Sequence, residues 1–465
     1  MFINFDQWPR YIILRIAMLG IVFLWGQPLA AQENSWKAGV STGIITPETP
    51  MWMAGYAARD RPAESSMHDL WVKALAIEDS MGRRAVFVSS DLLGLPKNIS
   101  DAVATKLMDK FQLERSQIML TSSHTHSGPV LSQSLIHIYP LDDDQKQEIE
   151  DYAGWLENKI VDVVSEAMTK MEPSQMFSGV GQLRFAVNRR NNSEKDILVA
   201  QDLKGPVDHS VPVLKLAHAD GTLQAVVFGY ACHATTLNGY QWSGDYPGFA
   251  QIDLESQYPG AVALFFAGCG GDQNPLPRRT IPLAKQYGRE LSAAVSRVME
   301  EPMTKLDPSL FTSYSQLELS HTEPLKVSEL QLLAASDTRY QSQWASHWLK
   351  VIASGTPVPT SYPHYPIQTW QLGNQTWVAL GGEVVVDYSI YLKRLFGQDL
   401  FVTAYANDVM AYIPSLRVLR EGGYEGDTSM RVYGLPASWS PEIEQVIIRE
   451  IQRQIGEISS NSIGK

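Results

Sequence analysis

The chain has 465 residues, of which 44% are hydrophobic and 19% charged, a composition typical of a globular protein with a sizeable core. Its formal net charge of −12 argues against nucleic acid as a partner, because a phosphate-binding face needs clustered lysine and arginine. The sequence contains no long run of charge, low-complexity tract or internal repeat, so a repeat architecture is not expected.

Residues 1–31 have the features of a secretory signal peptide. Arg10 and Arg15 precede an apolar run over residues 16–25, and small residues follow at 28–31. The run is shorter than the about 20 residues that span a bilayer, so an uncleaved N-terminal anchor is the less favoured alternative. We expect cleavage near Ala31 and export to the periplasm or the exterior.

Strand and helix patterns alternate along the mature chain, residues 32–465. Strands are predicted at 70–77, 85–89, 118–120, 211–216, 224–230, 261–266, 377–380 and 400–403, and helices at 99–111, 143–171, 281–298 and 322–348. Residues 355–365, rich in proline and tyrosine, predict a loop. No linker divides these elements, so we expect a single large mixed α/β domain whose functional loops emerge at strand ends.

A histidine pair follows one of these strands directly. His124 and His126 come just after the apolar run 118–120. If the strand continued to His124, the alternation of side chains would put both imidazoles on the same face, which is a usual beginning of a zinc site. For this motif taken alone, two solvent-facing histidines at a polar strand end are an equal alternative.

Four other polar residues also follow apolar strands, namely Asp91, His233, Glu383 and Tyr412. Any one of them is more often a cap or a satisfied edge residue than a ligand. Together with the histidine pair they favour a metal site at the strand ends, because two histidines and one glutamate with an open position are a zinc-hydrolase ligand set.

The sequence has two cysteines, Cys232 and Cys269. A disulfide between adjacent strand ends and a pair of buried thiols both remain open. Buried thiols are favoured, because both residues follow strongly apolar runs.

Short blocks along the sequence resemble a known family, the neutral/alkaline non-lysosomal ceramidases. These are zinc amidohydrolases that cut the N-acyl bond of ceramide. The resemblance covers their catalytic domain, which we expect residues 32–465 to form without the C-terminal immunoglobulin-like domain of the long ceramidases. The matching blocks are short but run in family order, at 53–56, 89–91, 124–129, 188–189, 232–235, 243–245, 271–272, 382–383, 412, 424–426 and 433–434.

The resemblance implies roles for individual residues. The zinc ligands would be His124, His233, Glu383 and Tyr412. The catalytic group around them would be His126, which handles a proton, Arg189, which binds a substrate oxygen or carboxylate, and Tyr424, which donates its hydroxyl to the developing oxyanion. Zn²⁺ would lower the pKa of its bound water toward ~7, so the implied activity is hydrolysis by metal-bound water.

One position departs from the family pattern. Asn274 stands where the ceramidases have a serine that has been considered catalytic. Asn274 can hydrogen-bond a substrate, but an amide side chain cannot form an acyl-enzyme ester.

Three functions remain open from the sequence. The first is a zinc amidohydrolase acting on a ceramide-like lipid or related N-acyl compound, with contact at a membrane surface for substrate access. The second is a zinc hydrolase of the same fold that cleaves a small polar amide or ester. The third is a non-catalytic binding protein that kept the fold. Pocket depth and polarity would separate the first two, and the sequence sets neither these nor the oligomeric state.

Overall fold

The computed structural model describes residues 35–135, 138–194 and 203–463. Residues Asn34–Lys465 form one compact unit. The signal peptide predicted over residues 1–31 lies outside the described residues and stays a prediction. No helix within the described ranges is both long and apolar enough to cross a bilayer.

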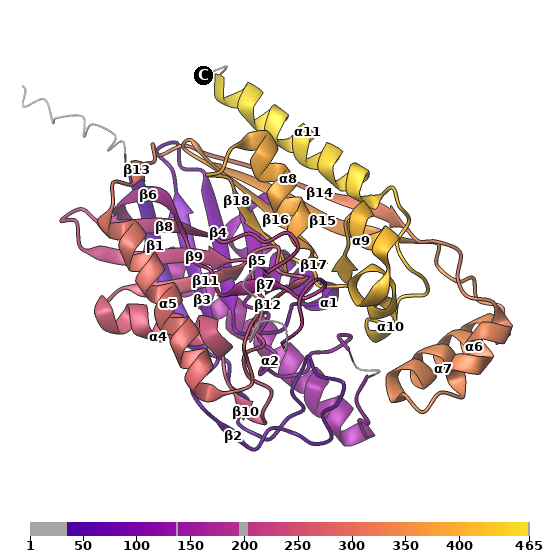
Figure 1. Ribbon diagram of the computed structural model, residues 1–465. Coiled ribbons are helices and arrows are strands. Elements are labelled where there is room, and N and C mark those ends of the chain that lie inside the picture. The colour runs from indigo at the N-terminus through magenta and orange to yellow at the C-terminus, as the bar shows by residue number, and fades with distance from the viewer. Residues whose placement is uncertain (1–34, 136–137, 195–202, 464–465) are drawn as a thin grey trace, which may run out of the picture. The chain divides into compact units, whose positions relative to one another are not determined.

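A large mixed sheet forms the centre of the fold (Figure 1). Its strand order is β11–β9–β8–β6–β1–β3–β4–β5, with β13 paired to β6. The strands are β1 (Trp36–Ile44), β3 (Trp71–Glu78), β4 (Arg84–Ser90), β5 (Ile118–Ser122), β6 (Glu172–Gln182), β8 (Ser210–His218), β9 (Leu223–Tyr230), β11 (Val262–Ala267) and β13 (Thr304–Lys305). The pairs β4–β5 and β9–β11 are parallel, whereas the strands between them are antiparallel.

Helices cover one face of this sheet. They are α1 (Lys97–Phe111) and α2 (Asp143–Thr169) over one half, and α4 (Asp245–Gln257) and α5 (Ile281–Glu300) over the other. Asp142 and Thr280 start α2 and α5 by accepting hydrogen bonds from the backbone N–H groups of the first turn. In β3, Ala74 faces the core beneath α1 and α2, while Leu75 faces the opposite core, as strand alternation requires.

A second sheet packs against the opposite face. It has the order β14 (Leu310–Ser320), β15 (Ser361–Leu372), β16 (Gln375–Leu380) and β18 (Phe401–Thr403). Large aromatic side chains join the two sheets: Trp377 lies 5.1 Å from Phe87 and 4.9 Å from Phe266 between ring centroids. The outer face is covered by α8 (Val386–Phe396) and α11 (Ile443–Ile463), as Figure 1 shows. The result is a four-layer α/β/β/α arrangement, and the predicted mixed α/β class is confirmed.

Two predicted segments differ from the structure. The helix expected over 322–348 is two helices, α6 (Val327–Ala334) and α7 (Arg339–Ala353), which pack around their own small core of Leu330, Trp344 and Trp348. The break falls at 335–338, where a serine and an aspartate favour turn over helix. The loop expected over 355–365 ends early, because β15 already begins at Ser361.

Short elements fill the edge of the fold where the parallel strands end. The short strand pairs are β2 (Ser65–Ser66) with β10 (Gln241–Trp242), β7 (Ala186–Asn188) with β12 (Gln273–Pro275), and β17 (Glu383–Val384) with β19 (Tyr412–Ile413). The short helical elements at this edge are α9 (Leu416–Glu421), a π-helical turn at Tyr424–Thr428 and α10 (Ser429–Val432), whereas a 3₁₀ turn at Arg115–Gln117 precedes β5 at the opposite edge. Cys232 and Cys269 lie near this edge as buried free thiols, and burial raises the pKa of both.

Candidate metal centre and active site

Short parallel pairings bring the predicted ligands together. An isolated bridge joins Thr125 to Ala234, which sets His124 and His126 beside His233. In the β17–β19 pair, Glu383 lies opposite Tyr412. Residues more than 280 positions apart in the sequence are thereby fixed at one place by backbone pairing at the ends of β5, β9 and β16.

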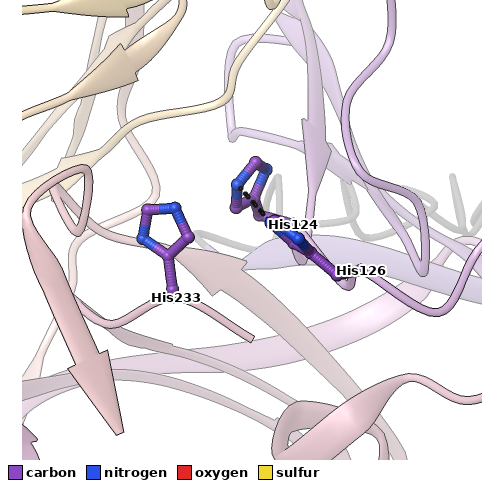
Figure 2. A group of neighbouring side chains, drawn as sticks. All are labelled: His124, His126 and His233. Carbon is purple, nitrogen blue, oxygen red and sulfur yellow. Dashed lines mark hydrogen bonds between the residues drawn. The ribbon is translucent and has the colours of Figure 1, made fainter. Parts of the chain in front are cut away.

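The way in which the two neighbouring histidines converge differs from the prediction. Strand β5 ends at Ser122, and His124 adopts the left-handed backbone conformation with φ of 58°. Strand alternation therefore does not set their orientation. The turn instead brings His124 Nε2 to 3.2 Å from His126 Nε2 with the ring planes almost perpendicular. Figure 2 shows these two rings and His233, which comes from a separate segment, gathered around a common space.

The donor atoms around this space have the separations of a metal site. Glu383 Oε2 lies 3.0 Å from His124 Nε2 and 3.1 Å from His233 Nε2. The Tyr412 hydroxyl oxygen lies 3.2 Å from His233 Nε2. Ligand atoms placed about 2.0–2.1 Å from a tetrahedral zinc ion are about 3.3 Å from one another, so these residues fit such an ion with little adjustment.

Hydrogen bonds to the far side of each ligand fix its orientation. His124 Nδ1 lies 2.6 Å from the Leu93 carbonyl, and His233 Nδ1 lies 2.7 Å from the Gly270 carbonyl. Because a carbonyl can only accept, each Nδ1 carries the proton and each Nε2 presents its lone pair to the shared space. Tyr433 donates its hydroxyl to Glu383 Oε1, whereas the buried Oε2 has no hydrogen-bond partner. An orphaned buried carboxylate oxygen between two imidazole nitrogens fits a bound cation.

Burial and electrostatics keep His233 in its metal-binding form. Burial alone would raise the pKa of Glu383, whereas a proton on His124 or His233 would lower it well below its ordinary value. Burial and the neighbouring Arg189 lower the pKa of His233 to about 4. At neutral pH the site therefore offers a neutral imidazole at His233, which is the form that binds zinc.

The predicted catalytic residues surround the ligand set. Arg189 follows β7 and donates from Nε to Glu425 (2.7 Å) and from Nη2 to the Tyr412 hydroxyl (2.9 Å). Asn274 lies on the paired strand β12, with Oδ1 3.5 Å from Arg189 Nη1. The Tyr424 ring centroid is 5.3 Å from that of Tyr412, and Tyr424 as a whole residue is 42% exposed. Tyr424, Arg189 and Asn274 line one cavity of about 530 Å³, and Arg189 joins this cavity to the predicted ligand set through its hydrogen bond to the Tyr412 hydroxyl.

The first half of the chain decides the family. Residues 36–275 match the family model described as "Neutral/alkaline non-lysosomal ceramidase, N-terminal". The chain belongs to this ceramidase family. The predicted resemblance is thereby confirmed.

Similar proteins agree with this assignment. The chain is 27% identical over 262 residues to the neutral ceramidase of Pseudomonas aeruginosa, a match that covers 53% of this chain and 38% of the relative. It is 28% identical over 226 residues to neutral ceramidase B of Dictyostelium discoideum, covering 44% of this chain and 30% of the relative. The matches thus span about a third of the length of these curated ceramidases.

The likeness in fold extends further along the chain than the sequence match. The crystal structure of the Pseudomonas aeruginosa neutral ceramidase aligns with a TM-score of 0.65 at 20% identity, over 85% of this chain and 71% of that one. A structure described as ceramidase complexed with C2 aligns with a TM-score of 0.67 at 19% identity, over 88% and 73%. Glu383, Tyr412 and Tyr424 lie beyond the family match at 36–275, and the geometry of this chain is what joins them to the two histidines of the ceramidase blocks.

Sequence reasoning gave no role to three residues at the site. Tyr405 stacks on His124 at 4.2 Å between ring centroids. Tyr433 donates a hydrogen bond to Glu383, and Glu425 accepts one from Arg189. Tyr433 and Glu425 fall in ceramidase blocks, so the resemblance could have marked them, whereas Tyr405 has no sequence signal. Asp91, grouped with the strand-end residues, instead accepts a hydrogen bond from the Trp71 backbone N–H at 3.1 Å, which is a structural role.

Proposed function

We propose that this chain is a zinc-dependent amidohydrolase that cleaves the N-acyl bond of ceramide or a related N-acyl compound. The observation that carries the proposal is the convergence of His124 Nε2, His233 Nε2 and Glu383 Oε2, the last buried without a hydrogen-bond partner. Tyr412 supplies a fourth donor. Imidazole, carboxylate and phenol ligands in a four-coordinate arrangement suit zinc. Membership of the ceramidase family supports amide hydrolysis as the reaction.

The residues around the ligands have complementary tasks in this proposal. Zinc bound there would polarise a carbonyl and lower the pKa of a water toward ~7. His126 places its Nε2 3.2 Å from that of His124, at the shared space, and in this proposal it transfers a proton there. Arg189, held by Glu425, presents a fixed guanidinium to a substrate oxygen. Tyr424 supplies a hydroxyl for the developing oxyanion.

The proposal is tested by assaying the zinc-loaded mature protein against N-hexanoyl-sphingosine and shorter N-acyl amides, with release of the free amine as the measurement. We expect turnover that is lost on treatment with a chelator and restored by zinc. A protein with stoichiometric zinc that cleaves none of these amides would contradict the proposal and favour the non-catalytic binding protein.

We also propose that the protein is exported. The support is the order of Arg10, Arg15, the apolar run 16–25 and the small residues before Gln32. N-terminal sequencing of the protein from its native host is expected to begin close to Gln32. A chain that retains Met1 and partitions with membranes would show that the segment is an anchor.

A further inference from the structure

The cavity beside the metal centre has an unusual wall for an enzyme whose family acts on lipid. Among the described residues that line it, six are arginine or glutamate, and the others include two asparagines, a serine and two glycines. Leu276 supplies an aliphatic side chain to this described part of the lining and Tyr424 an aromatic one. Sites that bind apolar ligands are lined mostly by hydrophobic side chains with a few polar groups, which is the reverse of this arrangement.

The charged side chains of the wall are paired with one another. Arg278 Nε lies 2.5 Å from Glu194 Oε1, and Arg190 contacts both Glu421 at 3.1 Å and Glu425 at 2.6 Å. Because each arginine is matched by carboxylates, the described part of the lining carries no large excess of either charge. The side chains of Glu194 and Glu421 are 46% and 41% exposed, so the wall still faces water.

Such a wall disfavours a hydrocarbon chain and suits a hydroxylated molecule. Laying a hydrocarbon over these ion pairs would remove their water without replacing its hydrogen bonds, which is unfavourable. A neutral molecule with several hydroxyl groups would replace that water group by group, and the aromatic side chain of Tyr424 in the cavity lining can pack against its carbon skeleton. In a ceramide-like amide, the hydrogen-bonding groups belong to the amine part, and the acyl part is hydrocarbon.

We infer that the preferred substrates are N-acylated polyhydroxy amines, of the amino-alcohol or amino-sugar class, whose amine part lacks a long hydrocarbon chain. This inference rests on the proposed amidohydrolase function and names the substrate class of the same site. The polar amine part occupies the cavity between Tyr424 and the Arg278–Glu194 pair, with the scissile amide toward Arg189 and the metal ligands.

Three substrates with the same hexanoyl group test the inference: N-hexanoyl-sphingosine, N-hexanoyl-2-amino-1,3-propanediol and N-hexanoyl-glucosamine. The propanediol amide keeps the amide and diol of the sphingosine compound and lacks its tail. We expect kcat/KM for the two hydrophilic amides to equal or exceed that for the sphingosine amide. If the cavity were an apolar slot, each methylene of the tail buried in it would raise kcat/KM for the sphingosine amide about fourfold, which amounts to more than ~10³ for the whole tail.

The outcomes separate the two proposals. If kcat/KM for the sphingosine amide exceeds that for both hydrophilic amides by more than about tenfold, the inference is overturned and the amidohydrolase function still stands. Hydrolysis of none of the three by the zinc-loaded protein overturns the amidohydrolase function itself.

A variant of the wall gives a second test. Arg278→Met keeps much of the side-chain volume and removes the charge and its donors, and we expect it to raise KM for the propanediol amide roughly threefold or more with zinc content unchanged. Glu421→Gln, on α9, weakens the Arg190–Glu421 ion pair, and we expect it likewise to raise KM for the propanediol amide with zinc content unchanged. The matched control is Arg297→Met, on α5, where the arginine side chain is 80% exposed and pairs with Glu301. An unchanged KM in both cavity variants overturns the inference.

Discussion

Replacing His124 and His233 together by alanine is expected to abolish stoichiometric zinc binding and, with it, hydrolysis. Both imidazoles present Nε2 to the oxygen of Glu383 at 3.0 and 3.1 Å, so the double variant removes two of the four donors that fit the ion. The loss of zinc affinity should exceed the about 10–100-fold that is typical when a hydrogen-bond partner of a ligand is removed. Metal analysis of the purified proteins by mass spectrometry measures the effect directly.

The control for this experiment is another histidine of the same chain. His218 ends β8, is partly exposed and pairs with Glu172 at 2.8 Å, so His218→Ala should retain the zinc content of the unaltered protein. His126→Ala provides a finer comparison, because the proposal places His126 outside the ligand set although its Nε2 lies 3.2 Å from that of His124. Zinc that survives in the double variant at one ion per chain would show that the ligands are other residues.

The amino-acid sequence predicts the elements that carry a strong apolar pattern better than those that do not. The helices at 99–111, 143–171 and 281–298 agree with α1, α2 and α5 within a few residues, because each has a long apolar stripe at helical spacing. The strand β6 has no such signal: Glu172 and Pro173 begin it, and glycines at 179 and 181 interrupt it. Its place in the sheet comes from pairing with β1, β8 and β13, which no local pattern contains.

The candidate site shows the same division between local and distant information. The residue types at strand ends and the family blocks were enough to name His124, His233, Glu383 and Tyr412. The reason why His124 and His126 converge was predicted wrongly, because a left-handed residue after Ser122 cannot be inferred from the alternation of a strand. The support for the ligands also escaped prediction, since Tyr433 and Glu425 act through side-chain contacts across 50 and 236 positions of the chain.

Tyr424→Phe is expected to lower kcat by about 10²–10³, because it removes a single hydroxyl that the proposal assigns to the oxyanion of the tetrahedral intermediate. The ring remains, so the contact with Tyr412 and the cavity wall are preserved, and zinc content should not change. Asn274→Ala should be milder, since Asn274 contributes at most a positioning contact to the substrate beside Arg189. Steady-state kinetics on a cleaved amide, with zinc content measured in parallel, distinguish these effects.

The asparagine at position 274 also bears on whether hydrolysis passes through a covalent acyl-enzyme. With an amide side chain at 274 in place of the family's serine, the chain has no nucleophile there, and we expect water to attack the acyl carbon without a covalent acyl-enzyme. Product release in pre-steady-state kinetics should then show no burst, and no acyl group should be found on the protein by mass spectrometry. A burst, or an acyl adduct on any side chain, would overturn this mechanism. Full activity in Tyr424→Phe would instead remove only the oxyanion role, because the zinc ligands do not depend on that hydroxyl.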